Sequence, residues 1–517
     1  MKVHGSKNAV RQQQSNAMPK IIDTSITTPD QLSEWEKEQI YNGLDCCITA
    51  EVMDALIPQF DEYTSKTYEF SKALQGPALE MRLRGVLVDQ QRKAQVIDEY
   101  YEKIDLLEGQ LERIVLEGVG LQSFNWRSNA DLQRLFFDEL GIPPPRGRRS
   151  VNRDALEKME AYIIARGIIR HITTMRELKK KIDVLKQEID PDGRIRTSYN
   201  IAGTSTGRFS SSFSEFGTGG NLQNVEESLR SIFISDPGQK FAKFDAKSGE
   251  SFVVGAIEWN LFNDPRYLDA VESGDVHTSV ARICWPQLQW TGNIKYDKDI
   301  AEQPYYRHYT YRFMCKKLGH GSNYGGKAAT LSTQSKLPIG IVEQFQPLYF
   351  RAYPAHLQWH AHVDSQLRRS GTLISLTGRK RQFWGRRTDE STLREAIAYD
   401  PQCSLAEIVN RAMLRIWRER PLGACVVMHD HDALTIQYPE PVEDELIPTL
   451  LELLKVPIPL ANNRTLLIPY DCKVGWNRGE YNEKSNPDGL KDYDTGDERR
   501  RSPEVHLLDR PVRRAYG

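Results

Sequence analysis

The spacing of apolar and polar residues divides the chain into segments of different expected structure. Residues 1–30 are polar and aperiodic, which predicts a disordered arm. From Ser33 a helical pattern leads into YNGLDCCITAEVMDAL, and residues 66–200 are mostly helical by pattern, with a long helix expected over residues 166–186. Residues 478–517 are polar and charged again. This change in composition predicts a poorly ordered tail.

Start and stop signals mark shorter elements within the helical region. Ser128 and Asn129 precede an amphipathic run that stops at Gly141 and three prolines. The sequence GPALEMRLRGVLVD, residues 76–89, pairs an apolar helix with a short strand-like run. The sequence DPDGRIR, residues 190–196, predicts a turn and then a strand.

Two β-rich regions carry carboxylates at their ends. KFAKFDAKSGESFVVGAIEW, residues 240–259, predicts a strand ending at Asp245, a turn, and a helix that carries Glu250. ACVVMHDHDALTIQ, residues 424–437, predicts two strands with HDHD at the bend between them. A carboxylate at a strand end is a usual placement for a metal ligand, but Asp245 alone fits a helix N-cap equally well. Histidines and aspartates crowded at a hairpin tip rarely serve packing alone, so the second region favours a functional site.

One stretch, RFMCKKLGHGSNYG at residues 312–325, carries a graded helical face. Four residues recur there at intervals of four: Arg312, Lys316, His320 and Tyr324. On a helix they share one face, and two cations followed by two rings match a nucleoside triphosphate. An amphipathic helix with a solvated cationic edge fits the spacing equally well. The interspersed glycines each cost a helix roughly 1 kcal/mol relative to Ala, which indicates that something bulky approaches the backbone.

Composition bounds the class of protein. A chain of 517 residues is long enough for about three domains, and 27% charged with 39% hydrophobic residues predicts a soluble globular protein. No apolar run is long enough to span a membrane, so no membrane partner is expected. The N-terminus lacks the apolar core of a secretory signal. Seven cysteines without a CxxC pair indicate a reducing, cytosol-like compartment and no structural zinc.

Charge is balanced over the whole chain but segregated locally. The formal net charge is −1, so nucleic-acid binding would require basic regions. TSTGRFSSS, residues 204–212, and NLQNV, residues 221–225, gather hydroxyls, amides and one arginine, which are typical of backbone and minor-groove contacts, although serine-rich loops are common. His277 begins a helix, where it either faces phosphate or acts as a cap. The basic segment 379–387 suits either single-strand contact or a solvated hairpin.

Together these motifs resemble the family A DNA polymerases, the DNA polymerase I group, and especially their phage branch. DAKSGESFVV resembles the first palm motif, RFMCKKLGHGSNYG the fingers helix RxxxKxxx(F/Y)xxxYG, and MHDH the second palm motif, which usually reads HDE. TSTGRFSSS and NLQNV resemble the primer–template loop, and the spacing from Arg394 to Gln402 resembles the helix that touches the template. The resemblance covers roughly residues 66–480 in the family's order.

A fragment of another family motif precedes this region. Tyr41 and Asp45 resemble YxxxD, the last motif of the 3′→5′ exonuclease domain in phage-type polymerases, where the Tyr positions water and the Asp binds metal. No DxE motif precedes Tyr41, and a two-metal site needs several carboxylates. We therefore interpret residues 31–65 as a truncated exonuclease remnant, in which Asp45 is a capping or surface residue.

The resemblance implies an α/β (α+β) architecture, the right-hand polymerase fold, with an antiparallel-sheet palm, a helical thumb and helical fingers. The expected parts follow in order along the chain: disordered arm 1–30, exonuclease-domain remnant 31–65, thumb 66–200, first part of the palm 201–265, fingers 266–390, second part of the palm 391–480, and polar C-terminal tail 481–517.

The resemblance also implies roles for individual residues. Asp245 and Asp430 would bridge two Mg²⁺ ions, with Ala246 as a further metal-site residue and Mn²⁺ as an alternative ion. Lys316 would be the third catalytic residue, because it would protonate the leaving pyrophosphate. The implied nucleotide-binding residues are Arg312, His277, His320, Tyr324 and Glu250. The implied DNA-binding residues are Arg208, Asn221, Gln223, Asn224, Arg394, Gln402 and His429.

Several of these residues would determine selectivity. Glu250 would block a ribose 2′-hydroxyl, so the enzyme would select deoxynucleotides, and Tyr324 would stack at the insertion site. Arg208 and Gln402 would read minor-groove acceptors, which every correct base pair presents in similar places. Closure of the fingers would make selection depend on the shape of the base pair.

Four positions depart from the family pattern. His320 replaces the usual Phe or Tyr, His431 replaces the usual Glu, Phe252 stands where many members carry Arg, and Ala398 stands where Asn is usual. None of these changes removes a core metal ligand, so an active enzyme is expected. Asp432, next to His431, is a candidate to replace the missing Glu.

The motifs therefore predict a DNA-templated DNA polymerase that adds deoxynucleoside monophosphates to a primer 3′-hydroxyl and lacks its own 3′→5′ proofreading. The expected partners are primer–template DNA, dNTPs and a separate exonuclease or processivity factor. The expected location is cytoplasmic, in the host cytoplasm if the source is viral. One alternative is a non-catalytic DNA-binding factor that retains the fold, and another is a polymerase that accepts an RNA template or ribonucleotides.

Overall fold

The computed structural model describes residues 30, 32–214, 217–307 and 309–494. The predicted disordered arm, apart from residue 30, and residues 495–517 of the predicted tail lie outside these ranges. The chain divides into two compact units, Met1–Thr67 and Tyr68–Gly517. Within the described ranges no helix combines the length and the apolar character that crossing a membrane requires.

The described part of the first unit is built around α2 (Glu34–Leu56), which a 3-10 helix follows at Ile57–Gln59. Ser33 begins α2 with a capping box, in which its hydroxyl accepts from the Glu36 N–H and the Glu36 carboxylate accepts from the Ser33 N–H at 3.0 Å. No residue of α2 is buried. Tyr41 is 66% exposed and Asp45 is also exposed, so Asp45 is a surface residue here.

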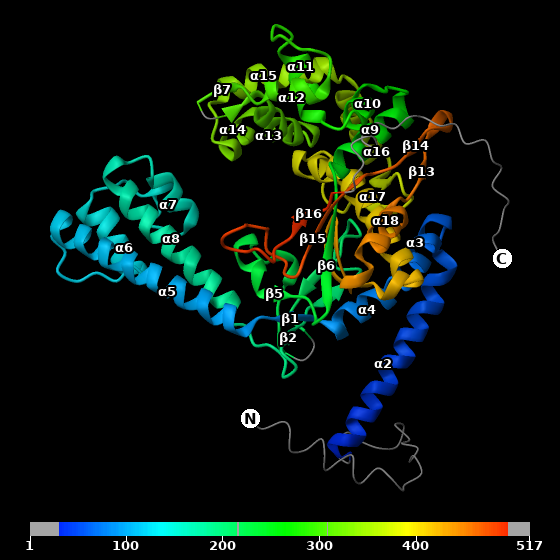
Figure 1. Ribbon diagram of the computed structural model, residues 1–517, viewed down its shortest axis with the longest axis horizontal. Helices are drawn as coiled ribbons and strands as arrows, with labels where there is room; N and C mark the ends of the chain where they lie inside the picture. The colour runs from blue at the N-terminus through cyan, green and yellow to red at the C-terminus, as the bar shows by residue number, and fades with distance from the viewer. Residues whose placement is uncertain (1–29, 31, 215–216, 308, 495–517) are drawn as a thin grey trace. The chain divides into compact units, whose positions relative to one another are not determined.

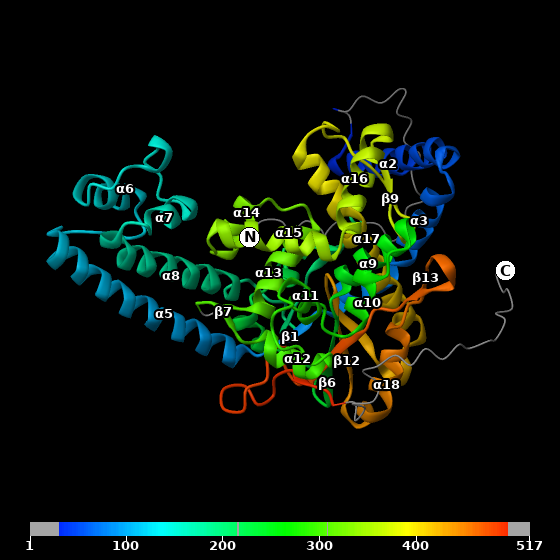
Figure 2. The same ribbon diagram turned by 90° about the horizontal axis from the view of Figure 1, so that it is seen from above.

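Two long helices, α5 (Gln90–Arg113) and α8 (Ile163–Leu185), pack side by side in the second unit (Figures 1 and 2). They form because each carries a buried apolar stripe, including Tyr100 and Ile104 on α5 and Ile168 and Ile172 on α8. Shorter elements of this region are α3 (Glu62–Ala73), which begins in the first unit, α4 (Gln75–Arg84), β1 (Val86–Val88), α6 (Asn129–Gln133) and α7 (Arg153–Met159). The helix predicted over residues 166–186 is therefore confirmed as α8.

Pi-helical and 3-10 turns complete this region. Single π-helical turns extend α5 at Ile114–Val119 and α6 at Arg134–Glu139, and a 3-10 turn lies at Pro145–Gly147. The predicted start of α6 is confirmed, because the Ser128 hydroxyl accepts a hydrogen bond from the Asp131 N–H at 3.2 Å.

The central sheet has five antiparallel strands in the order β11-β12-β6-β15-β16, of which β6, β15 and β16 are labelled in Figure 1. Its strands are β6 (Gln239–Ala246), β11 (Cys425–Asp430), β12 (Ala433–Pro439), β15 (Tyr470–Gly475) and β16 (Lys491–Asp492). Successive side chains of a strand point to opposite faces, so Phe244 enters the core whereas Asp245 stays partly exposed. The buried face shares one hydrophobic core with α9 (Gly249–Phe262) and α17 (Glu390–Glu419).

Smaller sheets join the flanking segments. They consist of β2 (Arg194–Ile195) and β5 (Phe233–Ile234) on either side of β1, β3 (Ser198–Asn200) with β4 (Ser210–Ser212), β7 (Pro304–Tyr306) with β8 (Tyr309–Thr310), β9 (Thr372–Ile374) with β10 (Lys380–Gln382), and β13 (Ile458–Pro459) with β14 (Thr465–Leu466). Short 3-10 turns lie at Leu222–Asn224, Glu227–Ile232, Pro421–Gly423, Glu440–Val442 and Ala461–Asn463, and α18 spans Glu443–Leu454.

A group of helices lies between α9 and α17 in the chain. It comprises α10 (Arg266–Glu272), α11 (Val276–Cys284), α12 (Ile294–Ala301), α13 (Tyr311–Asn323), α14 (Ala328–Ser335), α15 (Ile339–Ala352) and α16 (Ala355–Ser370). The graded stretch of the sequence is α13, which begins where the Thr310 hydroxyl accepts from the Phe313 N–H at 3.1 Å. The helix predicted there is confirmed, with Tyr324 at its C-cap.

The prediction of a poorly ordered tail from residue 478 onward is wrong for residues 478–494. β16 pairs with β15, and the loop between them returns to β5 through a bridge between Ile234 and Asn477. The Asn477 side chain donates to Asn486 Oδ1 at 2.7 Å, which closes this loop on itself. We call residues 476–490 the C-terminal clasp. Its polar residues bond to one another, so a polar composition there does not mean disorder.

Candidate active site

Two aspartates lie in one cross-strand row at the end of the central sheet. Ala433 on β12 pairs with Asp245 on β6 and, on its other side, with Asp430 on β11. Residues paired directly across strands point to the same face, so both carboxylates emerge on one side of the sheet. Two strand spacings place their Cα atoms about 10 Å apart. The predicted strand–turn–strand and strand–turn–helix units are confirmed, and the sheet brings their ends together.

The turn between β11 and β12 consists of His431 and Asp432 alone. His431 has a φ of 62°, a left-handed conformation that histidine tolerates better than most residues. The Asp432 carbonyl accepts a hydrogen bond from the Ala246 N–H at 3.0 Å, which ties the turn to the end of β6. Burial, with a further contribution from the charge of Asp245, raises the pKa of Asp432.

Each aspartate of the row faces a basic side chain. Asp430 forms an ion pair with Arg478, whose side chain is only 1% exposed, while Asp430 itself is 13% exposed. Lys243 lies 3.5 Å from Asp245, which is 48% exposed. Asp430 Oδ1 is buried and has no hydrogen-bond partner among the described residues.

This donor set fits a divalent-cation site that the substrate completes. The described part of the chain holds no group of three or more His, Cys, Asp or Glu side chains arranged to hold a metal. Mg²⁺ is usually bound by one or two carboxylates together with substrate phosphates. The unpartnered Oδ1 of Asp430 and the exposed carboxylate of Asp245 are suitable donors for such a site.

Glu250, near the start of α9, connects three groups on other elements. Its Oε1 accepts a hydrogen bond from Arg208 Nη2 at 2.5 Å, and its Oε2 accepts one from the Tyr324 hydroxyl. His320 Nε2 lies 3.9 Å from the same Oε2, and the His320 and Tyr324 rings pack edge to face at 5.1 Å. Burial, reinforced by the neighbouring Glu250 charge, raises the pKa of Tyr324. The structure therefore brings together three predicted nucleotide-binding residues, Glu250, His320 and Tyr324, with Arg208, which was predicted to contact DNA.

The cationic end of α13 is partly neutralised. Arg312 Nε donates to Asp275 Oδ2 at 2.8 Å and its Nη1 donates to Glu302 Oε1 at 3.4 Å. Lys316, one turn further along, is exposed and makes no hydrogen bond or ion pair with the described residues. Burial lowers the pKa of His277 to about 4; the charge of Asp275 opposes this shift, and the charges of Arg312 and Lys316 add to it. His277 is therefore a neutral hydrogen-bonding group at neutral pH rather than a third cation.

The loop residues predicted to contact DNA divide into exposed and buried ones. Asn221 and Asn224 are exposed, and Asn221 Oδ1 caps the short turn by accepting from the Asn224 N–H at 3.2 Å. Gln223 is buried and its Nε2 donates to the His429 carbonyl at 2.9 Å. On α17, Arg394 is about half exposed, whereas Gln402 is partly buried.

His429 is completely buried. Its Nε2 lies 2.8 Å from Asn410 Oδ1, and its ring stacks on Phe209 at 4.7 Å. Burial lowers its pKa to about 4. The ring thus presents no atom to DNA in this conformation, and the DNA contact predicted for His429 stays a prediction.

The sequence of the chain is similar to those of known DNA polymerases. The sequence model described as "DNA polymerase family A" matches residues 92–480. The chain belongs to DNA polymerase family A. It is 27% identical over 483 residues to the thermostable DNA polymerase I of Thermus aquaticus. This alignment covers 88% of this chain and 53% of the relative. It is 29% identical over 337 residues to DNA polymerase I of Treponema pallidum, which covers 61% of this chain and 31% of the relative.

A solved structure shares the fold of this family A chain. The POL domain of Pol1 from M. smegmatis, in complex with DNA primer-template and dNTP, matches with a TM-score of 0.62 and 22% identity. The match covers 79% of this chain and 69% of that chain. The predicted fold class, helices with an antiparallel sheet in a polymerase arrangement, is confirmed. The chain spans about half the length of the Thermus relatives that it matches.

Bulky neighbours of the α13 glycines come from the chain itself. A Cβ on Gly321 would lie 2.3 Å from a methyl of Leu331, and one on Gly326 would lie 2.8 Å from the same side chain. Gly319 faces Tyr349 at 3.5 Å. Close packing of Leu331 on α14 therefore explains Gly321 and Gly326, whereas a Cβ on Gly319 would meet Tyr349 only at an ordinary contact distance.

A buried polar network that the sequence did not reveal ties the end of α13 to α9. Glu258 on α9 pairs with His356 Nδ1, and His356 Nε2 lies 3.1 Å from the Tyr349 hydroxyl. Tyr349 donates to Asn323 Oδ1 at 2.5 Å, and Asn323 Nδ2 donates to the Tyr267 hydroxyl at 2.9 Å. All five residues are at most 3% exposed. Because the network joins four other helices to α13, sequence spacing gave no signal for it.

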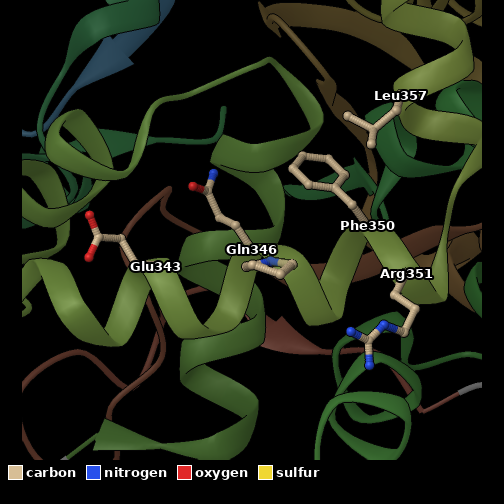
Figure 3. A pocket seen from close by; sticks show the side chains of 6 residues that line it. Glu343, Gln346, Phe350, Arg351 and Leu357 are labelled. Atoms are coloured by element: carbon tan, nitrogen blue, oxygen red, sulfur yellow. The ribbon is translucent and has the colours of Figure 1, made fainter.

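A surface hollow lies along α15, away from the aspartate row. It has a volume of about 520 Å³ (Figure 3). The lining residues are Glu343, Gln346, Pro347, Phe350, Arg351 and Leu357. None of the predicted site residues lines it.

Proposed function

We propose that this chain is a DNA-templated DNA polymerase that adds deoxynucleoside monophosphates to a primer 3′-hydroxyl by a two-metal mechanism. The observation that carries this proposal is the shared row of Asp245 and Asp430 on either side of Ala433. Membership of DNA polymerase family A supports it. So does the likeness to a POL domain whose structure was solved with DNA primer-template and dNTP.

Asp245 and Asp430, with Ala246 beside them, would hold two Mg²⁺ ions, or Mn²⁺ in their place. Such ions lower the pKa of an attacking hydroxyl and neutralise the charge of a triphosphate and its leaving group. The two carboxylates define where the primer end and the nucleotide meet, because they share one face of the sheet.

Positive charge for the triphosphate would come from α13. Lys316 is exposed and unpaired among the described residues, so its ammonium would be available to bind phosphate and to donate a proton to pyrophosphate. Arg312 is held by Asp275 and Glu302, so binding phosphate requires it to exchange or share these partners. His277 would contribute a neutral hydrogen bond until phosphate raises its affinity for a proton.

The sugar and base would be selected around Glu250. Its carboxylate, fixed by Arg208 and Tyr324, would exclude a ribose 2′-hydroxyl. The Tyr324 ring would stack at the insertion site, with His320 in the place where the family usually has Phe or Tyr. DNA would be held by Arg208, Asn221, Gln223, Asn224, Arg394, Gln402 and His429. For the two buried members, Gln223 and His429, contact with DNA requires a rearrangement.

We also propose that the chain does not proofread on its own. Asp45 is exposed and belongs to no cluster of three metal-donor side chains in the described part of the chain. A separate exonuclease or processivity factor would then act with it on primer–template DNA. The cysteines in the described part are free thiols, which supports a reducing, cytoplasmic location.

Primer extension with Mg²⁺ and dNTPs tests the proposal. Asp430→Asn removes the carboxylate charge without changing size, and we expect at least a hundredfold slower extension, on the order of losing a key electrostatic group. Asp444→Asn is the matched control, because Asp444 is an exposed aspartate at the start of α18, outside the row. Equal extension by wild type and Asp430→Asn would contradict the assigned site. Binding of primer–template without incorporation by wild type would support the alternative of a non-catalytic factor.

A further inference from the structure

Arg478 reaches the aspartate row from a part of the chain outside the motifs. It lies in the C-terminal clasp, where its backbone N–H donates to the Phe233 carbonyl at 2.9 Å. The clasp is closed by Asn477 and Asn486, and Gly479 packs so closely that a Cβ would lie 3.0 Å from Ser231 Cα. In Figure 1 the clasp is the red loop that lies beside β5. Arg478 is therefore delivered to Asp430 by rigid packing rather than by a flexible tail.

The ion pair of Arg478 and Asp430 is buried, but only some of its polar atoms have hydrogen-bond partners. Arg478 Nη2 bonds Asp430 Oδ2, while Arg478 Nε and Nη1 and Asp430 Oδ1 are buried without partners among the described residues. Unpaired buried polar atoms are costly, so a native site that keeps them calls for an explanation beyond stability. One carboxylate oxygen of Asp430 is thus held by a fixed cation, while the other is buried without a partner among the described residues.

Basic side chains also offset three of the carboxylates around the site, whereas the neighbouring Asp432 and Asp471 have no such ion pair among the described residues. Asp430 faces Arg478, Asp245 faces Lys243, and Glu250 faces Arg208. A site with so little excess negative charge attracts a divalent cation weakly. A nucleoside triphosphate would supply the missing negative charge and further oxygen ligands.

We propose that Arg478 is a positioning residue that holds Asp430 in place and makes cation binding at the aspartate row depend on the nucleotide. Arg478 orients the carboxylate through Oδ2, so that Oδ1 faces the metal position. Its fixed charge opposes metal binding until phosphate charge arrives. This proposal rests on the proposed polymerase function and concerns the same site.

Mn²⁺ binding to the full chain, measured by electron paramagnetic resonance without DNA or nucleotide, tests the proposal. Arg478→Gln keeps a hydrogen-bond donor and removes the charge, and we expect it to bind Mn²⁺ at least about tenfold more tightly than wild type. Arg478→Lys keeps the charge and should bind Mn²⁺ about as weakly as wild type. Adding a nucleoside triphosphate should reduce the difference in Mn²⁺ affinity between wild type and Arg478→Gln, because the phosphates then supply negative charge to both proteins.

Controls separate this effect from a general loss of structure. Arg176→Gln removes a partly buried arginine of α8 that donates to the Val151 carbonyl at 2.8 Å rather than to a carboxylate, and it should leave Mn²⁺ binding unchanged. The double variant Asp430→Asn with Arg478→Gln should lose the increase in Mn²⁺ affinity if that increase arises at Asp430. If Arg478→Gln does not fold, Asn477→Ala loosens the clasp and should raise Mn²⁺ affinity in the same direction.

Different outcomes would overturn the role of Arg478 and the proposed polymerase function. Unchanged or weaker Mn²⁺ binding by folded Arg478→Gln, with normal primer extension by wild type, would overturn the role of Arg478 alone. Failure of wild type to extend a primer would instead contradict the polymerase function. A tenfold gain in Arg478→Gln that Asp430→Asn removes would support the assignment of Arg478.

Discussion

The buried pair of Glu258 and His356 makes a strong prediction about stability. Glu258 is 1% exposed and His356 is fully buried, so neither side chain can exchange its partner for water. His356→Leu would leave Glu258 buried and unpaired, and breaking a buried pair from one side typically costs about 3–5 kcal/mol. Replacing both residues, as in Glu258→Leu with His356→Leu, removes the unpaired group, so most of that cost should disappear.

Urea unfolding of the two single variants, the double variant and wild type measures this effect. The double variant should be more stable than the sum of the single effects predicts by about 2 kcal/mol or more, because the partners are in direct contact. Hydrogen exchange of α16 amides would report the local part of the change, since the chain has more than one unit. The exposed pair of Arg92 and Glu99 is the control, and its single changes should cost at most about 1 kcal/mol.

Two results would refute this reasoning. A cost below about 1 kcal/mol for His356→Leu would mean that the buried pair does not hold the network together. Strict additivity in the double variant would mean that Glu258 and His356 act independently in solution. Either result would also weaken the idea that the network fixes Asn323, and hence Tyr324, at the end of α13.

The remaining predictions concern pH and substrate choice. The pKa of His277 is lowered to about 4 in the folded chain, so the unfolded state binds more protons below the ordinary value of 6.5. His277 should therefore contribute about 3 kcal/mol to the rise in stability as pH increases from 4 to 6.5, and His277→Phe should remove this contribution in pH-resolved denaturation. Glu250→Ala should increase incorporation of NTPs relative to dNTPs in primer extension, whereas Glu250→Asp should retain part of the discrimination; equal ratios in all three proteins would contradict the role of Glu250.

Local elements were predictable from the sequence because their signals are local. Capping side chains such as Ser128 and apolar periodicity located the helices, and alternating runs that end in Asp245 and Asp430 located the strands of the site. Only the family resemblance indicated that Glu250, Arg208 and Tyr324 belong to one site, and it did not predict the contacts between them. Spacing along the chain does not show which loop faces which helix.

Features that depend on distant partners were missed. Arg478 stands in a polar stretch whose composition resembles a disordered tail, yet packing against β5 buries it. Glu258 and His356 are far apart in the sequence, and each alone resembles an ordinary polar residue on a helix. The glycines at the end of α13 predicted a bulky neighbour, but not that at Gly321 and Gly326 this neighbour is Leu331 of the chain itself.

The two-residue turn of His431 and Asp432 has a consequence for how this site tolerates change. Because side chains alternate along a strand, one residue inserted or deleted between Asp430 and Ala433 would exchange the faces of β11. Asp430 would then enter the apolar interior and His429 would turn outward. This corner should therefore tolerate a change of residue, such as the histidine at 431, better than a change in the number of residues between the strands.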